Sequence, residues 1–141
     1  MKVLSFGSLN IDYVYKVDHF VQKGETMSSL GLNVFSGGKG LNQSIALAKA
    51  GVETWHAGAI GEDGKFLVAE MEAAGVNTSC TALLDDVRTG NAIIQNDKSG
   101  DNCILLYGGA KSGYGLLQQS LSLYGNISPQ TLLLYQMQRM K

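Results

Sequence analysis

The sequence is poor in cysteine, histidine and proline, with two, two and one of each. Cys80 and Cys103 share no metal-ligand spacing with each other or with a histidine, and nothing recommends a disulfide between them. We therefore expect two buried, reduced thiols and neither a zinc site nor a disulfide framework. His19 and His56 are expected to be surface or packing residues.

Charge is scarce as well, with 16% charged residues and a net charge of −1. This leaves no basic footprint, so neither nucleic acid nor an anionic membrane is expected as a partner. No apolar run approaches the length of a membrane span, and the first residues are too few and too polar for a signal peptide. These features predict a cytoplasmic protein. With 45% hydrophobic residues, the 141-residue chain can bury a real core.

Acidic residues are missing from one segment altogether, because all 12 of them precede Lys111. The composition changes abruptly at Ala110, and Leu and Gln dominate afterwards. We therefore separate residues 1–110 from an atypical tail, 111–141, such as a frameshift or an early gene end would produce. A helix around Leu116–Leu121 and a strand over Leu132–Tyr135 are expected in this tail.

What is present is an alternation of strand and helix signals, typical of a parallel α/β sheet. Strands are expected over Val3–Phe6, Asn10–Asp18, Thr26–Phe35 and Glu53–Ile60, and a hairpin over Asn91–Asn96 and Asn102–Tyr107. One helix is expected from Leu41 to Gly51, and a second, capped by Asp63, through Leu67, Met71 and Ala74. The hairpin and the early strand pair predict a small second sheet.

The stretch from Ser36 to Gln43 carries three glycines and a lysine directly before the first helix. Glycine bares the backbone, and a helix start offers unpaired N–H groups, so this loop is suited to a polar ligand. It is not a P-loop, because Asn33 and Gly40 replace the required glycine and hydroxyl residue. Nor do Gly58, Gly61 and Gly64 have dinucleotide-fingerprint spacing. Taken alone, the glycine loop is equally compatible with a tight strand-to-helix turn.

Asn10 and Asp12 are two residues apart on an expected strand, so they share one face. A carboxylate accepts hydrogen bonds and a carboxamide both accepts and donates, so this pair can bind adjacent hydroxyls of a polyol. The alternative is a solvated strand face.

Together, Gly7–Asp12 and Gly37–Gln43 closely resemble the two N-terminal signatures of the PfkB-type, ribokinase-like carbohydrate kinases. The resemblance continues through Gly24–Thr26, Leu41–Gly51, Ile60–Phe66, Ala74–Thr78, Thr89–Ala92 and Tyr107–Ala110. It implies a ribokinase-like α/β fold: an incomplete three-layer α/β sheet with a small β-sheet lid. Residues 1–110 would be the N-terminal part of that domain, with lid strands at about 10–36 and 88–108.

The resemblance also implies a sugar site. Asn10 and Asp12 would hold sugar hydroxyls from the lid side. The opposite wall would comprise Gly38, Lys39 and Asn42, with Gly37 shaping the loop. The apolar face of the same strand, from Ile11 to Val17, needs cover, and in this family a second subunit's lid supplies it. A homodimer through the lid strands is therefore expected.

The family transfers phosphate from ATP, with Mg²⁺, to ribose or a related sugar. Its catalytic aspartate, anion hole, nucleotide pocket and cation site lie in the C-terminal half. We therefore expect the substrate-binding portion of such a kinase, with no catalytic or metal-binding residue, poor binding of ATP and Mg²⁺, and no activity alone. The alternatives are a non-catalytic sugar-binding or self-associating module, a fragment of a fructokinase or nucleoside kinase, and a chain that works with a separately encoded C-terminal half.

Overall fold

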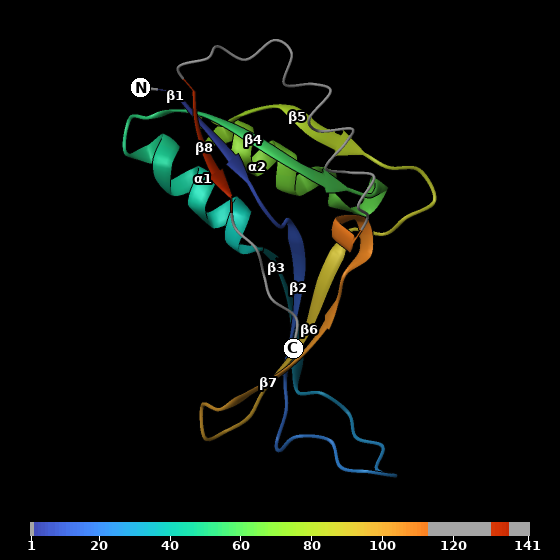
Figure 1. Cartoon of the computed structure of the whole chain (residues 1–141). Coiled ribbons are helices and arrows are strands. Elements are labelled where there is room, and N and C mark those ends of the chain that lie inside the picture. Colours follow the sequence, from blue (N-terminus) through green and yellow to red (C-terminus); the bar gives the residue numbers. More distant parts are fainter. Residues whose placement is uncertain (1, 113–130, 136–141) are drawn as a thin grey trace.

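The computed structural model describes residues 2–112 and 131–135 (Figure 1). The strands are β1 (Lys2–Phe6), β2 (Asn10–Lys16), β3 (Gly31–Gly37), β4 (Glu53–Ile60), β5 (Asn77–Leu83), β6 (Gly90–Asn96), β7 (Asn102–Tyr107) and β8 (Thr131–Tyr135). The helices are α1 (Lys39–Lys49) and α2 (Lys65–Ala73), with short 3-10 turns η1 (Glu62–Gly64) and η2 (Gly109–Ser112).

Four strands form a parallel sheet in the order β5-β4-β1-β8, with every neighbouring pair parallel. Helices α1 and α2 cover one of its faces, where Leu41, Leu67 and Met71 pack with Ile60 of β4. A smaller cluster of Leu4, Ala57 and Cys80 lies on the opposite face. The alternation of apolar strands and amphipathic helices therefore produces the predicted parallel α/β arrangement.

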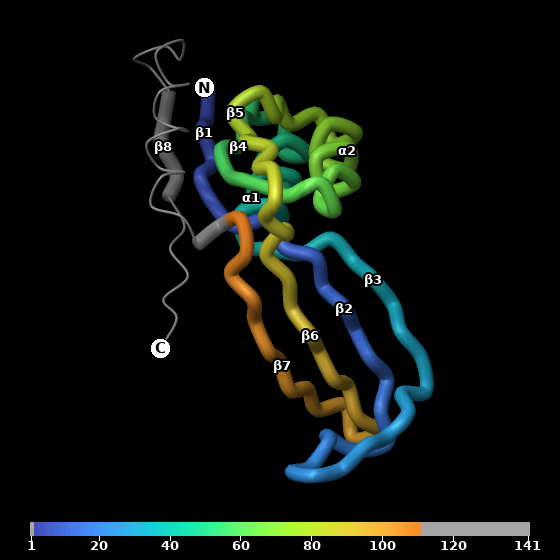
Figure 2. Tube along the Cα trace, turned by 90° about the vertical axis from the view of Figure 1, so that its right-hand side faces the viewer, coloured from blue at the N-terminus to red at the C-terminus, as the bar shows by residue number. Residues whose placement is uncertain are grey.

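The other four strands form a mixed sheet in the order β3-β2-β6-β7. Strands β2 and β6 are parallel, whereas β3 and β7 pair antiparallel at the two edges. This mixed sheet projects away from the parallel sheet, as Figures 1 and 2 show from two directions. The predicted hairpin is β6–β7, and the predicted fold class, an α/β sheet with a small second sheet, is confirmed.

Two strand predictions need correction. Strand β3 begins at Gly31 rather than Thr26, because the ladder with β2 ends where Gly31 pairs with Lys16. Strand β5 was not predicted at all, since its first residues, from Asn77 to Ser79, are polar. Its parallel pairing with β4 is a tertiary interaction that overrides this weak local preference.

Asp63 does not cap the second helix, contrary to the prediction. Helix α2 begins at Lys65 after Gly64, and no side chain caps it. Asp63 lies one turn earlier, in η1, and its carboxylate instead accepts hydrogen bonds from Thr89. A residue distant in sequence thus competes successfully for the carboxylate that the local pattern assigns to the helix.

The predicted strand at Leu132–Tyr135 is confirmed as β8, which pairs in parallel with β1 from Lys2↔Thr131 onward. The helix expected around Leu116–Leu121 lies outside the described residues. Within residues 2–112 and 131–135, no helix is long and apolar enough to cross a membrane.

The burial of Cys103, and that of Ile11 and Val17, differs from what the sequence predicts. Cys80 is buried as predicted, but Cys103 is exposed, because it lies on the edge strand β7. Ile11 and Val17, expected to need cover from a second subunit, are already buried within the chain, at 2% and 4% exposure. Ile11 packs into the core under the helices, which reach the base of the mixed sheet.

Candidate functional site

The candidate site forms where the chain passes from β1 into β2. The backbone carbonyl of Ser8 accepts a hydrogen bond from Leu41 N–H at 3.2 Å, so the start of α1 is joined directly to this crossing. Gly38, immediately before the helix, has φ of +100°. A Cβ at this position would overlap the Ser8 carbonyl oxygen and lie 3.0 Å from Asn10 N. Both the backbone conformation and the space therefore require glycine here.

The pairing of β2 with β3 brings the two predicted halves of the site together. Asn10 lies directly opposite Gly37, and Asp12 follows on the same face of β2. A Cβ added to Gly37 would come within 2.5 Å of all three atoms of the Asp12 carboxyl group. The carboxylate thus lies against the bare backbone of the glycine loop, with Asn10 buried and Asp12 half-buried beside it.

Lys39 and Asn42 occupy the first turn of α1 and are both exposed. Asn42 N–H donates to the Gly38 carbonyl at 3.1 Å, which closes that first turn. No side chain caps the helix, and its first turn contains no acidic residue. No acidic residue of that turn therefore offsets the positive end of the helix dipole. This end of the helix lies next to Lys39 and close to Asp12. Hydrogen-bond donors and acceptors within one small area suit a ligand rich in hydroxyl groups.

A buried hydrogen bond joins α1, the helix that follows the glycine loop, to β4 of the parallel sheet. Ser44 of α1 and Nδ1 of His56 on β4 are hydrogen-bonded at 2.7 Å, and both residues are fully buried. Burial lowers the pKa of His56 to about 4, partly opposed by the backbone of Gly7, so the ring is neutral near pH 7. His56 is the packing residue that the sequence predicts, and His19 is exposed at the surface, bonded to Glu25 at 2.9 Å.

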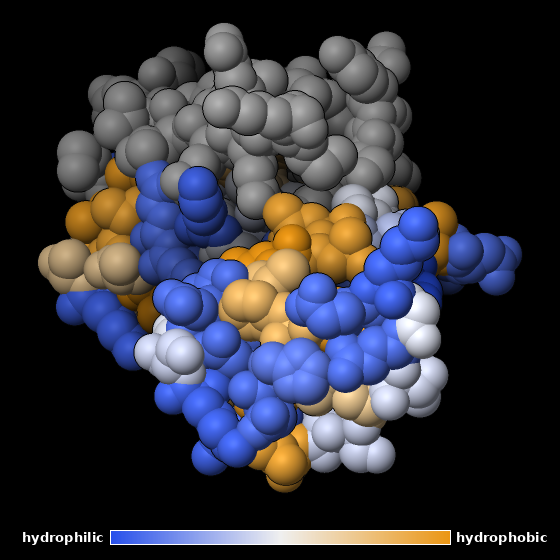
Figure 3. Space-filling view, turned by 90° about the horizontal axis from the view of Figure 1, so that it is seen from below, coloured by the Kyte–Doolittle hydropathy of each residue, from blue (hydrophilic) through white to orange (hydrophobic). Residues whose placement is uncertain are grey.

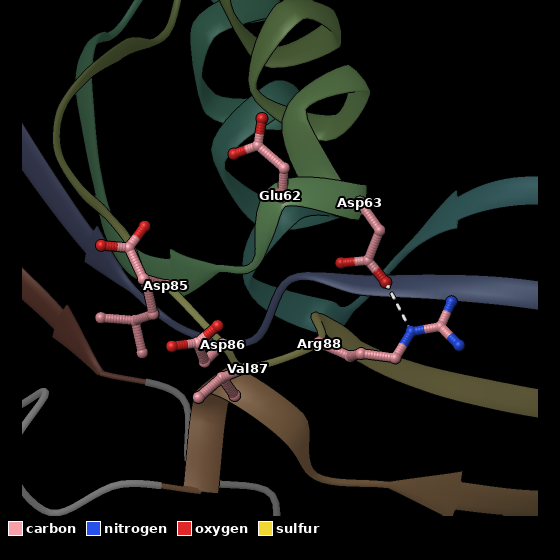
Figure 4. A pocket seen from close by; sticks show the side chains of 7 residues that line it. Glu62, Asp63, Asp85, Asp86, Val87 and Arg88 are labelled. Atoms are coloured by element: carbon pink, nitrogen blue, oxygen red, sulfur yellow. Dashed lines mark hydrogen bonds and ion pairs between the residues drawn. The ribbon is translucent and has the colours of Figure 1, made fainter.

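A separate pocket of about 690 Å³ lies between the η1 turn and the segment connecting β5 to β6 (Figure 4). Its lining residues are Glu62, Asp63, Leu84, Asp85, Asp86, Val87 and Arg88. Arg88 Nε donates to Asp63 Oδ2 at 3.0 Å across its rim. Within the described part of the chain, no three His, Cys, Asp or Glu side chains are placed to hold a metal ion.

Sequence reasoning did not find the interactions made by Asp63, Arg88 and Thr89. The signal was present, because Ile60–Phe66 and Thr89–Ala92 are both segments of the family resemblance. The sequence did not show that these two segments touch each other. Thr89 is fully buried against the turn after β4, which only the folded chain makes visible.

The glycine loop thus lies at the junction of a parallel sheet with helices on one face and a projecting mixed sheet. The sequence model of the pfkB family carbohydrate kinases matches residues 1–127. The chain belongs to this family.

Among curated relatives, the ribokinase of Staphylococcus aureus (strain COL) is 37% identical over 112 residues, covering 77% of this chain and 37% of the relative. The ribokinase of Cryptococcus neoformans var. grubii serotype A, solved in complex with ADP, is 44% identical with a TM-score of 0.72. That of Arabidopsis thaliana, complexed with ribose and ATP, is 31% identical with a TM-score of 0.70. Each match covers 77% of this chain, and 35% and 36% of the solved chains, respectively. The chain therefore spans little more than a third of the length of these relatives.

Proposed function

We propose that this chain is the sugar-binding portion of a ribokinase-like kinase, with the sugar held between β2 and the glycine loop. The observation that carries the proposal is the Asp12 carboxylate lying against the Gly37 backbone. A Cβ at position 37 would overlap the carboxyl group, so only glycine lets the Asp12 carboxylate lie directly against the loop that begins α1. Relatives named ribokinase, and one solved with ribose and ATP, favour ribose as the sugar.

Each site residue has a distinct role in this proposal. Asp12 accepts hydrogen bonds from sugar hydroxyls, and Asn10 both accepts and donates on the same strand face. Gly37 and Gly38 let the loop backbone pack against Asp12 and Ser8, which places the first turn of α1 beside the site. Lys39 and Asn42 supply donors from the first turn of α1. The mixed sheet acts as the lid over this site.

Phosphoryl transfer itself needs more than these residues. ATP with Mg²⁺ would supply the phosphoryl group, and positioning and charge stabilisation provide most of the catalysis in such transfers. The family resemblance assigns the catalytic aspartate and the anion hole to a later part of the sequence, and we assign neither role to a described residue of this chain. We infer that the 141 residues alone bind sugar without phosphorylating it. A coupled kinase assay with ribose and ATP tests this, and turnover comparable to that of a complete ribokinase would contradict it.

Ribose titration by calorimetry tests the sugar site. A partial pocket leaves several hydroxyls in water, so we expect weak binding, on the order of millimolar. Asp12→Ala should abolish it. Asp18→Asn is the matched control, because this carboxylate is exposed just beyond β2 and pairs with Lys98. If Asp12→Ala binds ribose as well as the wild type, the proposed site is wrong. Fructose and a nucleoside, titrated in parallel, test the alternative substrates.

A second proposal, self-association through the mixed sheet, is favoured by its exposed apolar side chains. They are Leu32 and Val34 on β3, and Leu105 and Tyr107 on β7, which the strand register sets on the face opposite Asp12. Figure 3 views the molecule from below and shows orange patches between the blue side chains. We propose that a second copy of the chain covers them. Sizing chromatography should show a dimer that Leu105→Lys dissociates, whereas Leu83→Lys, an exposed leucine on β5, leaves it intact. A monomeric wild type would contradict this proposal.

A further inference from the structure

On its β6–β7 side, the mixed sheet is entered and left by the chain at one point beside Thr89. Thr89 immediately precedes β6, and its hydroxyl accepts a hydrogen bond from Gly61 N–H at 2.9 Å, just after β4 ends. On the way back, Ala110 N–H donates to the Arg88 carbonyl at 2.9 Å, just after β7. Both connections on the β6–β7 side of the mixed sheet are therefore fixed at residues 88 and 89.

The Asp63 carboxylate is the acceptor that holds this point. Its Oδ1 accepts from Thr89 N–H at 2.9 Å and from the Thr89 hydroxyl at 2.7 Å, and its Oδ2 accepts from Arg88 Nε at 3.0 Å. Partial burial raises the pKa of Asp63, but the hydrogen bonds from Thr89 and Arg88 outweigh this and leave it below its usual value. The carboxylate is thus ionised at neutral pH, as three donors directed at two oxygens require.

The geometry points to Asp63 as a positioning residue that fixes the mixed sheet relative to the parallel sheet. Its partner Thr89 precedes Gly90, which pairs with Asn10, and two residues later Ala92 pairs with Asp12. Any movement of Thr89 is therefore transmitted through one strand pairing to both proposed sugar-binding side chains. This inference rests on the proposed function only for the identity of the ligand, a sugar, that the mixed sheet covers.

Asp63 and its hydrogen bonds to Arg88 and Thr89 form a clamp. The chemistry of this clamp explains why a carboxylate is needed. Asparagine has the same shape but only one acceptor oxygen, so its NH₂ group would face either the Thr89 donors or the Arg88 donor. The turn is also built closely around Thr89, because a Cβ on Gly64 would overlap the Thr89 hydroxyl oxygen. The Thr89 donors consequently have little room to move toward other acceptors.

Hydrogen–deuterium exchange on the full chain tests this role without any ligand. Asp63→Asn and Thr89→Val should accelerate amide exchange in β2 and β6 at least about tenfold, while β1 and β4 stay within about twofold of the wild type. Thr89→Ser keeps the hydroxyl and should restore wild-type exchange. Glu62→Gln is the matched control, since Glu62 is an exposed carboxylate of the same turn that pairs with Lys65.

A uniform acceleration across both sheets would mean that Asp63 contributes only to general stability, and no acceleration would mean that the clamp is dispensable. Either result overturns the inference. If Asp63→Asn does not fold, the wild-type chain decides the question: the Thr89 amide must exchange as slowly as the amides of β6, and faster exchange overturns the proposal.

Ribose titration adds a second readout. Asp63→Asn should weaken ribose binding about three- to tenfold, although Asp63 is outside the proposed sugar site, and Thr89→Ser should not. Unchanged affinity in a variant with a loosened mixed sheet would contradict the positioning role. Failure of the wild type to bind ribose would refute the proposed function and leave the exchange result standing on its own.

Discussion

Ser44 on α1 and His56 on β4 are joined by a 2.7 Å hydrogen bond inside the core. Both side chains are fully buried, and α1 is the helix that begins at the glycine loop. This bond fixes how α1 lies against the parallel sheet, and so where its first turn points.

Acidification should unfold the protein partly through His56. Its pKa is lowered from 6.5 to about 4 by burial, so between these values the unfolded chain binds the proton more strongly. The contribution is fully present above pH 6.5 and is lost as the pH falls to about 4, amounting to about 3 kcal/mol. Chemical denaturation at a series of pH values measures it.

His56→Gln, which does not titrate, serves as the comparison for that experiment. Its stability should fall less steeply than that of the wild type between pH 6.5 and 4. The pKa of His19 is raised by Glu25 and Asp18, so its contribution has the opposite sign, but both proteins contain His19 and this contribution cancels in the comparison. Parallel curves for the two proteins would show that His56 is not a buried neutral group.

Removing the Ser44 hydroxyl should leave the buried His56 Nδ1 without its partner. We expect Ser44→Ala to lower the free energy of unfolding by about 1–3 kcal/mol. Denaturant titration at pH 7.5 checks this. Ser79→Ala, at an exposed position on β5, should change stability by less than about 0.5 kcal/mol. Equal effects at the two positions would refute the role assigned to the buried pair.

A comparison of Gly38 with Gly51 separates the stability cost of backbone strain from that of a steric clash. Both have positive φ, +100° and +82°, but a Cβ at Gly51 would meet nothing within 4 Å, whereas one at Gly38 would overlap the Ser8 carbonyl. Gly51→Ala should therefore cost only about 1–2 kcal/mol, and Gly38→Ala distinctly more. Unfolding free energies from denaturant titration compare the two, and equal losses would argue against the close loop packing described above.

The core under the helices should be sensitive to cavity formation. Met71 is fully buried in the cluster with Leu41 and Leu67. Met71→Ala should cost about 2–5 kcal/mol of stability, because the helices cannot collapse fully into the space left behind. Glu70→Ala, exposed on the same helix, should change stability by less than about 0.5 kcal/mol. Thermal unfolding of both variants provides the measurement.

The sequence was sufficient for the elements whose own residues carry the pattern. Alternation from Asn10 onward predicted β2, and Leu41 and Ile45 at helical spacing predicted α1. It was insufficient where a distant partner decides the structure. Strand β5 forms despite its polar start because β4 pairs with it, and Asp63 leaves the helix cap because Thr89 offers two donors.

The same distinction applies to the candidate site. Asn10, Asp12 and the glycine loop could be selected from residue chemistry and family resemblance. Their meeting depends on the register that sets Asn10 opposite Gly37, which no local pattern specifies, because a one-residue slip would turn Asp12 to the other face. The exposure of Cys103 likewise depends on β7 being an edge strand.

The central claim is that Asp12 and the glycine loop together hold a sugar. Backbone amide NMR spectra recorded during a ribose titration of the wild-type chain test it most directly. We predict that the largest shifts fall on residues 10–12 and 37–42, with little change in β5 or α2. Shifts concentrated around the Asp85–Arg88 pocket, or none at a ribose excess of about a hundredfold over the protein, would contradict the account.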